Sequence, residues 1–173
     1  ADSARNWRLS RAVCSHGFDS LSEAQGKVLR DDTLLAVFLS DMTVNVTEMF
    51  RDPEVFRTIR ADVVPRLATY PRIKVWVAGC ATGEEAYSVA ILLAESGLLD
   101  RATIFATDID AESLRVATSA IYPADTMAGA TRNYQASGGV RPFSDWYVAK
   151  YDRSILSPEL RPRIEFFSHN LAT

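Results

Sequence analysis

Two glycines and two glutamates lie close together in the segment V-A-G-C-A-T-G-E-E at residues 77–85. The spacing of Gly79 and Gly83 lets a backbone turn sharply and approach a ligand with no Cβ in the way. The segment matches neither GxxxxGK[ST] nor GxGxxG, so it lacks the lysine and the hydroxyl of a phosphate-binding loop. It therefore favours close contact with a ligand of another kind.

The two glutamates narrow the choice of ligand. Glu84 and Glu85 come at the start of the next predicted helix, where a dinucleotide site would place its pyrophosphate. Two carboxylates there would repel a diphosphate, but they suit a ligand that carries an ammonium and a sulfonium cation. S-adenosylmethionine is such a ligand. A plain first-turn role for Glu84, favoured by the helix dipole, is the alternative.

Asp108 is the second candidate ligand contact. It follows the β-rich run T-I-F-A-T at residues 103–107. An acidic residue in this position of an adenosine-binding fold accepts hydrogen bonds from the ribose hydroxyls. Alternatively, Asp108 caps the next helix, although Asp110 is available as that cap.

The elements around these residues predict how they are positioned. A β-rich run at residues 74–78 leads through the glycine loop into an apolar helix at 84–96, and the run at 103–107 leads into a helix ending near Ala120. This βαβα order predicts an α/β fold with a doubly wound parallel sheet. Because ligands bind beyond the carboxyl ends of such strands, we expect the glycine loop and Asp108 to share one rim.

The flanking segments predict further units. Residues 1–43 read as three short helices, the third at 33–42, with a capping box at Ser20 and Glu23. Asp52 as the N-cap and Pro53 as the first helical residue open a further helix that Pro65 kinks or ends. Residues 126–162 have poor periodicity and many aromatics, which indicates an insertion whose aromatics form a small core of their own or a partner surface. A strand is predicted at 164–167. A doubly wound domain normally continues with another β and α unit, so we expect a chain truncated at its C-terminus.

Composition excludes several function classes. The 173 residues are 47% hydrophobic, which is typical of a globular domain, and the net charge of -3 disfavours nonspecific nucleic-acid binding. We expect a cytoplasmic protein with no membrane insertion, because no run approaches the roughly 20 apolar residues of a membrane span and no signal peptide is recognisable. Cys14 and Cys80 have no metal-ligand spacing, so no metal site is predicted, and Cys80 reads as a small apolar filler.

Three segments together carry a family resemblance. They are N-V-T-E-M-F-R-D-P at 45–53, V-W-V-A-G-C-A-T-G-E-E-A-Y-S at 75–88 and A-T-D-I-D at 106–110. In this order and spacing they closely resemble the chemotaxis receptor methyltransferases, the CheR family. The resemblance implies a Rossmann-like class I S-adenosylmethionine-dependent methyltransferase domain at 44–173, preceded by a small all-helical domain at 1–43 and carrying a small inserted β-subdomain at about 126–162.

The resemblance also implies a set of site residues. Cofactor contacts carry over from the family motifs to Asn45, Thr47, Arg51, Gly79, Glu84, Asp108, Asn170 and Leu171. The family's next motif, of the type R-N-V-L-I-Y-F, lies beyond Thr173, and with it further cofactor contacts and a proposed catalytic tyrosine.

The implied reaction is transfer of a methyl group to glutamate side chains of chemoreceptor-like proteins for sensory adaptation. A carboxylate is already a competent nucleophile, so positioning matters most, with Arg51 as the catalytic cation that steadies it. An ion pair of Arg51 with Asp52, Glu48 or Glu84 is the alternative. A cofactor-binding signalling module without methylation, or a methyltransferase for a non-receptor substrate, stays open on the same fold.

The family's N-terminal domain also implies a partner surface. Arg5, Arg8 and Arg11 recur at a three-residue spacing and predict a basic stripe that docks on acidic receptor helices, or else an ordinary solvated face. We expect the protein to act as a monomer.

Overall fold

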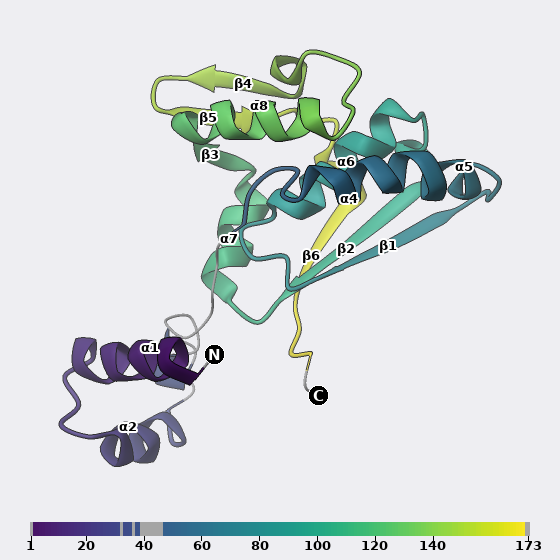
Figure 1. The fold of residues 1–173 in the computed structure, drawn as a ribbon. Coiled ribbons are helices and arrows are strands. Elements are labelled where there is room, and N and C mark those ends of the chain that lie inside the picture. The colour runs from purple at the N-terminus through teal and green to yellow at the C-terminus, as the bar shows by residue number, and fades with distance from the viewer. Residues whose placement is uncertain (1, 32, 36, 39–46, 172–173) are drawn as a thin grey trace.

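The computed structural model describes residues 2–31, 33–35, 37–38 and 47–171, and it contains two separate sheets (Figure 1). The first is parallel, in the order β1-β2-β6, and the second is antiparallel, in the order β3-β5-β4. The strands are β1 (Ile73–Ala78), β2 (Ala102–Asp108), β3 (Ile121–Pro123), β4 (Tyr147–Lys150), β5 (Arg153–Leu156) and β6 (Ile164–Ser168). The predicted parallel sheet is thus confirmed.

The carboxyl ends of the three parallel strands meet at one rim. Ala78 at the end of β1 pairs with Thr107, and Asp108 at the end of β2 pairs with Ser168. Side chains alternate along β1, so that Ile73 and Val77 are buried while Trp76 is 59% exposed. The sheet therefore buries one face in the main core and carries its functional loops at one edge.

Two helices follow the first two parallel strands as the sequence predicts. Helix α6 (Glu84–Glu95) is apolar on most sides. Its Ile91 belongs to the same buried core as Ile104 of β2. Helix α7 (Ala111–Ser119) is capped by Asp110, whose carboxylate accepts the backbone N–H groups of Glu112 and Ser113 at 3.2 and 3.3 Å. The cap of α7 is therefore Asp110, as predicted, and Asp108 is left for another role.

The helical segment before β1 begins where predicted but lacks the predicted side-chain cap. It comprises α4 (Pro53–Thr58), a π-helical turn (Ile59–Val63) and α5 (Val64–Leu67). Pro53 begins the helix as predicted, but the predicted side-chain cap by Asp52 is wrong. The backbone of Asp52 is left-handed, with φ 57°, whereas a capping side chain needs an extended backbone. The kink predicted at Pro65 coincides with the π turn, in which the Val64 N–H bonds Ile59 O, and Pro65 itself has no N–H to donate.

The second sheet and helix α8 (Met127–Ala136) lie between α7 and β6 in the chain. The sheet begins at Ile121. The insertion was predicted to begin at about residue 126, where the periodicity is lost, because the strand I-Y-P is too short to show a period. Tyr134 and Phe143 from this region pack against Phe50, with ring centroids 5.2 and 6.3 Å away. Among the aromatics of residues 126–162, Tyr134, Phe143 and Trp146 are buried, whereas Tyr151 is 91% exposed at the β4–β5 turn.

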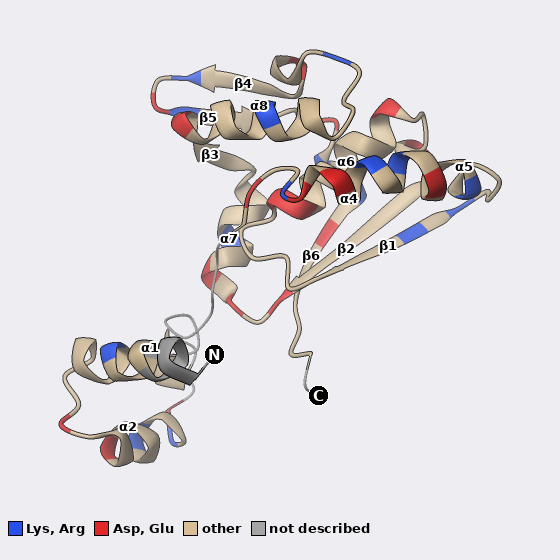
Figure 2. Cartoon of the chain, viewed as in Figure 1, with Lys and Arg blue, Asp and Glu red and all other residues tan. Residues whose placement is uncertain are grey.

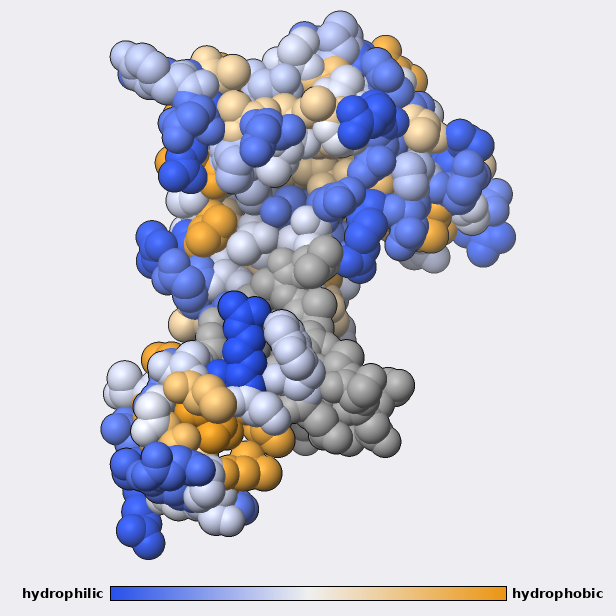
Figure 3. All heavy atoms as spheres, turned by 60° about the vertical axis from the view of Figure 1, so that its left-hand side comes forward, coloured by the Kyte–Doolittle hydropathy of each residue, from blue (hydrophilic) through white to orange (hydrophobic). Residues whose placement is uncertain are grey.

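The N-terminal helices pack around a small cluster of their own. Helices α1 (Asp2–Ser15) and α2 (Leu21–Val28) bury Val13, Phe18 and Ala24, and partly buried Leu34 and Phe38 pack against these. Ser20 caps α2 by accepting the Glu23 N–H at 3.2 Å, as predicted. The helix predicted at residues 33–42 falls partly outside the described residues. Apolar side chains remain at the surface of this unit, including Leu29 at 74% exposure (Figure 3).

Helix lengths also bear on the membrane question. No helix among the described ranges is long and apolar enough to cross a bilayer.

Gly83 supplies a test of the packing between α6 and α7. It has φ 93°, and a Cβ built there would lie 2.8 Å from the Cβ of Ala117. We expect Gly83→Ala to lower the free energy of unfolding by about 2–4 kcal/mol, because backbone strain adds to the clash. Gly79 has φ 72° and open space around its Cβ position, so Gly79→Ala should cost only about 1–2 kcal/mol. Urea denaturation measures both, and equal losses would contradict the packing argument.

Candidate functional site

The loop after β1 is fastened to the end of β2 by three backbone donors. Gly79 and Cys80 donate to Thr107 O at 2.8 and 2.9 Å, which extends the ladder past the end of the strand. The Ala81 N–H then donates to Asp108 Oδ2 at 2.7 Å. The predicted meeting of the glycine loop and Asp108 at one rim is therefore confirmed.

Positive backbone angles make this loop possible. Gly79, Ala81 and Gly83 have φ 72°, 46° and 93°. Glycine reaches such angles at no steric cost, so two of the three turns occur at the residue type best suited to them. No heavy atom lies within 4 Å of the position that a Cβ would take on Gly79. A ligand can thus approach the backbone closely at this point, as the sequence predicts.

Asp108 is buried but keeps capacity to accept further hydrogen bonds. Its side chain is 8% exposed, and besides Ala81 N it accepts the Asp110 N–H on Oδ1 at 2.9 Å. An ionised carboxylate offers about four acceptor positions, of which these two donors use half. The remaining positions fit a pair of vicinal hydroxyls, so the structure is compatible with a ribose contact, which stays a prediction.

Glu84 is the first residue of α6, and it is partly buried. Its Oε2 accepts the Thr82 hydroxyl at 2.7 Å. Burial raises the pKa of the Glu84 carboxyl above its ordinary value, because the charged form loses hydration. Figure 2 shows acidic residues here and in the loop between β2 and α7. A cation placed beside Glu84 would offset the cost of its burial, whereas a phosphate would increase it.

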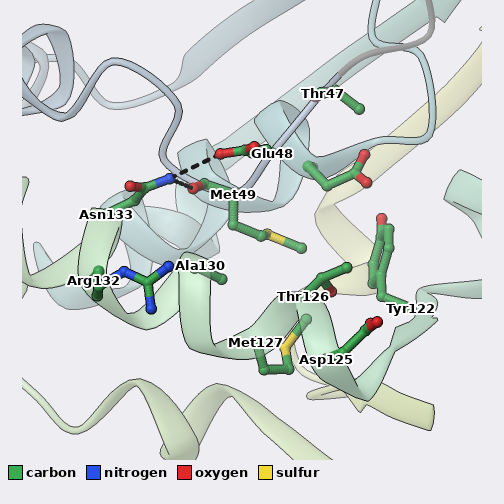
Figure 4. Close-up of a pocket in the computed structure, with 12 residues that line it drawn as sticks. Thr47, Glu48, Met49, Tyr122, Asp125, Thr126, Met127, Ala130, Arg132 and Asn133 are labelled. Carbon is green, nitrogen blue, oxygen red and sulfur yellow. Dashed lines mark hydrogen bonds between the residues drawn. The ribbon is translucent and has the colours of Figure 1, made fainter. Parts of the chain in front are cut away.

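A cavity of about 290 Å³ lies beside this glutamate (Figure 4). Thr47 and Glu84 line it, and the structure thereby brings together two of the predicted cofactor residues. The other lining residues come from the segment after Thr47, from β3 and from the α8 region. They are Glu48, Met49, Tyr122, Asp125, Thr126, Met127, Gly129, Ala130, Arg132 and Asn133.

Sequence reasoning missed Tyr122, which joins the cavity to the glycine loop. Its side chain is 3% exposed, and its hydroxyl donates to Thr82 O at 2.8 Å. Burial raises the pKa of Tyr122 above its ordinary range, and the negative charge of Glu84 adds to this. The residue pair I-Y after the end of α7 gave no periodic signal. The signal that could have identified Tyr122 is its residue type, because a buried tyrosine needs a hydrogen-bond partner for its hydroxyl.

Asn133 and Arg132 were also missed, since both belong to the region predicted as an insertion. The Asn133 amide donates to Met49 O at 3.2 Å and to Glu48 Oε2 at 3.3 Å, as the dashed lines of Figure 4 show. These bonds attach α8 to the segment that carries Thr47. The cavity is thus built from chain segments that are distant in sequence.

The remaining predicted residues lie outside this cavity. Arg51 is exposed and its Nε lies 3.9 Å from Asp52 Oδ2, which is one of the alternatives foreseen for it. Asn170 and Leu171 are exposed after β6, in a segment that the His169 N–H attaches to Asp108 O at 2.9 Å. Asn45 lies outside the described residues.

Cys80 lies within the glycine loop but is not poised for chemistry. It is 1% exposed, and burial, with the negative charge of Asp108, raises the pKa of its thiol to about 12. The thiol therefore stays protonated near neutral pH and acts as a small packing group. Among the residues that the structure describes, no group of His, Cys, Asp and Glu is arranged to hold a metal ion.

Comparison with known proteins agrees with this geometry. Residues 45–173 match the family model of the CheR methyltransferase, SAM binding domain. The chain belongs to this family. S-adenosylmethionine as the cofactor, predicted from the charge of the loop, is confirmed by that match.

Three relatives illustrate the membership. A Pseudomonas putida protein named "Putative methyltransferase Cher3" is 48% identical over 166 residues, which is 96% of this chain and 61% of the relative. A "Chemotaxis protein methyltransferase" of Listeria innocua is 32% identical over 146 residues, covering 83% of this chain and 53% of the relative. "Chemotaxis protein methyltransferase 1" of Vibrio cholerae is 35% identical over 123 residues, covering 66% and 45%. The chain thus spans about half of the length of these CheR relatives.

The raised pKa of Glu84 predicts a pH-dependent stability. As the pH rises through the ordinary value of 4.5, the unfolded chain ionises Glu84 before the folded chain does, so the folded state loses stability until its own higher pKa is passed. Glu84→Gln removes this loss and keeps an acceptor for Thr82. We expect the variant's advantage in free energy of unfolding, from urea titrations, to grow from pH 4 upward and then level off.

Glu85→Gln is the matched control, because it removes a charge from the same turn at an exposed position. Subtracting its effect isolates the burial of Glu84. An advantage of Glu84→Gln that shrinks as the pH rises would contradict the burial argument.

Proposed function

We propose that the chain is the cofactor-binding part of a protein-glutamate O-methyltransferase that esterifies glutamates of chemoreceptor-like proteins for sensory adaptation. The observation that carries the proposal is the buried Asp108 beneath an open glycine loop, with Glu84 at the adjacent helix start. The relatives named chemotaxis protein methyltransferase support the same substrate class.

The proposed cofactor contacts extend around the rim. Asp108 holds the ribose, Gly79 lets the loop approach the ligand, and Glu84 faces its positive charge. Asn45, Thr47, Arg51, Asn170 and Leu171 complete the set that the family motifs indicate. S-adenosylmethionine supplies a methyl group activated by a sulfonium.

The chemistry asks the protein for position rather than for a base. A bond forms between a glutamate oxygen and the methyl carbon as the carbon–sulfur bond breaks, and the electron pair of that bond stays on sulfur. No proton has to move, because the carboxylate is ionised at neutral pH. The chain must therefore hold the carboxylate oxygen in line with the methyl carbon and sulfur.

Arg51 is the proposed cation that steadies the reacting carboxylate. Its side chain is 55% exposed and its partner Asp52 is 76% exposed, at a separation of 3.9 Å. Such an exposed pair contributes at most about 1 kcal/mol, so a substrate carboxylate can replace Asp52 at little cost.

The N-terminal helices and the second sheet are proposed as accessory units. Residues 1–43 form a helical domain whose basic residues Arg5, Arg8 and Arg11 dock on acidic receptor helices, and the β3-β5-β4 sheet with α8 forms an inserted subdomain. Arg11 lies over the ring of Trp7 at 5.4 Å. A cytoplasmic monomer that binds no nucleic acid completes the proposal.

A methyl-transfer assay with the full-length protein tests both the function and Arg51. Labelled S-adenosylmethionine and a receptor cytoplasmic fragment should give base-labile label on glutamate. We expect Arg51→Ala to lower kcat by about a hundredfold, because a charge that stabilises the reacting group is lost. Arg66→Ala, which removes an exposed arginine of α5, is the control and should leave kcat unchanged.

Other outcomes point to the other readings. Tight cofactor binding without transfer would favour a signalling module, and base-stable label would favour a different acceptor. An Arg51→Ala variant with full kcat would remove Arg51 from the reaction.

A further inference from the structure

The charges around the cavity are uneven. Three acidic residues, Glu48, Glu84 and Asp125, line it together with one basic residue, Arg132. A glutamate side chain that enters this space carries the same sign of charge as three of the four charged residues that line it, and those three repel it. A carboxylate substrate therefore needs a cation at the cavity, and Arg51 is not among its lining residues.

Arg132 is placed to be that cation. It is the one basic residue of α8 and forms the blue band on that helix in Figure 2. Figure 4 shows its guanidinium turned toward the cavity, and the Nη2 atom lies 3.8 Å from the Cβ position of Gly129. A Cβ at residue 129 would therefore be in ordinary van der Waals contact with the guanidinium, which places the guanidinium beside the lining residue Gly129.

Neighbouring arginines are already engaged, but Arg132 is not. Arg57 pairs with Glu54, Arg60 with Glu95, and Arg141 with Asp145. Within the described part of the chain, no hydrogen bond or ion pair occupies the guanidinium of Arg132. Its five N–H donors are therefore available for a planar, two-point contact with a carboxylate.

The helix that carries Arg132 is held on both sides of it. Asn133 bonds Met49 O and Glu48, while the hydroxyl of Tyr134 bonds the buried carboxylate of Glu95. Arg57 also donates to Ala136 O near the end of the helix. The backbone position of Arg132 is consequently fixed before any substrate arrives, which lowers the entropic cost of using it.

We propose that Arg132 receives the carboxylate of the acceptor glutamate and so determines that the site takes glutamate rather than glutamine. This inference rests on the proposed function. Methylation removes the negative charge of the acceptor, so the product ester loses its attraction to Arg132 and its release is favoured. Arg132 acts as a specificity-determining residue, while Arg51 serves the reacting oxygen.

Binding measurements on the full-length protein saturated with S-adenosylhomocysteine test the proposal without requiring turnover. The probe is a chemoreceptor cytoplasmic fragment with either glutamate or glutamine at its methylation sites. We expect the parent to bind the glutamate form about tenfold more tightly, Arg132→Gln to bind both forms alike, and Arg132→Lys to fall between them. Arg153→Gln, an exposed arginine of β5 whose Nε lies 3.8 Å from Asp152, is the control and should keep the parent's preference.

Two results would overturn the proposal. One is a parent that binds the glutamate and glutamine forms equally, or an Arg132→Gln variant that still prefers the glutamate form. The other is an Arg132→Gln variant that no longer binds S-adenosylhomocysteine while its thermal melt is unchanged, because this would assign Arg132 to the carboxylate of the cofactor.

Methyl transfer measured on the same samples keeps the two proposals apart. A preference for the glutamate form that depends on Arg132, without methyl transfer, would contradict the proposed function alone. Methyl transfer by the parent, together with an unchanged preference for the glutamate form in Arg132→Gln, would contradict the role of Arg132 alone.

Discussion

The hydrogen bond from the Ala81 N–H to the Asp108 carboxylate is the interaction on which the rest of the site depends. It joins the loop after β1 to the end of β2, at 2.7 Å and out of water, so the two neighbouring strand ends behave as one surface. A buried charge is stable only when it is hydrogen-bonded, and Asp108 meets this condition with backbone donors while keeping acceptor capacity. The positive φ of Gly79 and Gly83 follows from this closure, because the chain must turn twice to return to the start of α6.

The second sheet is attached to the same loop rather than standing apart from it. Tyr122 on β3 donates its hydroxyl to Thr82 O, between the two glycines, and Asn133 on α8 holds the segment after Thr47. The start of α6, residues 47–49, β3 and α8 therefore line one cavity. A displacement of one of these segments would alter the others, since the bonds of Tyr122 to Thr82 and of Asn133 to Met49 are partly buried. This coupling gives a physical reason for placing substrate recognition on α8.

The parallel sheet and the rim were predictable because their signals are local. The β-rich runs, the glycines before α6 and Asp110 as the cap of α7 each follow from residue type within a few positions. The cavity was not predictable in the same way. Tyr122, Arg132 and Asn133 acquire their meaning from segments far away in sequence, and no periodicity marks them.

Local rules also failed where the backbone is unusual. Asp52 has the residue type of a cap, but its left-handed backbone prevents the contact, and the chain's turn at this point is set by packing around Phe50, which is fully buried. The role proposed for Arg51 beside it involves a second molecule, and for this reason no local pattern of the sequence marks it.

Calorimetric binding of S-adenosylhomocysteine to this chain tests whether Asp108 anchors the cofactor. Asp108→Asn keeps the shape and one acceptor oxygen but removes the charge, and Glu112→Gln removes an exposed carboxylate from the nearby start of α7. We expect Asp108→Asn to weaken binding by at least about tenfold, because hydrogen bonds to a charged group are lost, while Glu112→Gln binds like the parent. Equal affinity in Asp108→Asn and the parent would contradict this expectation.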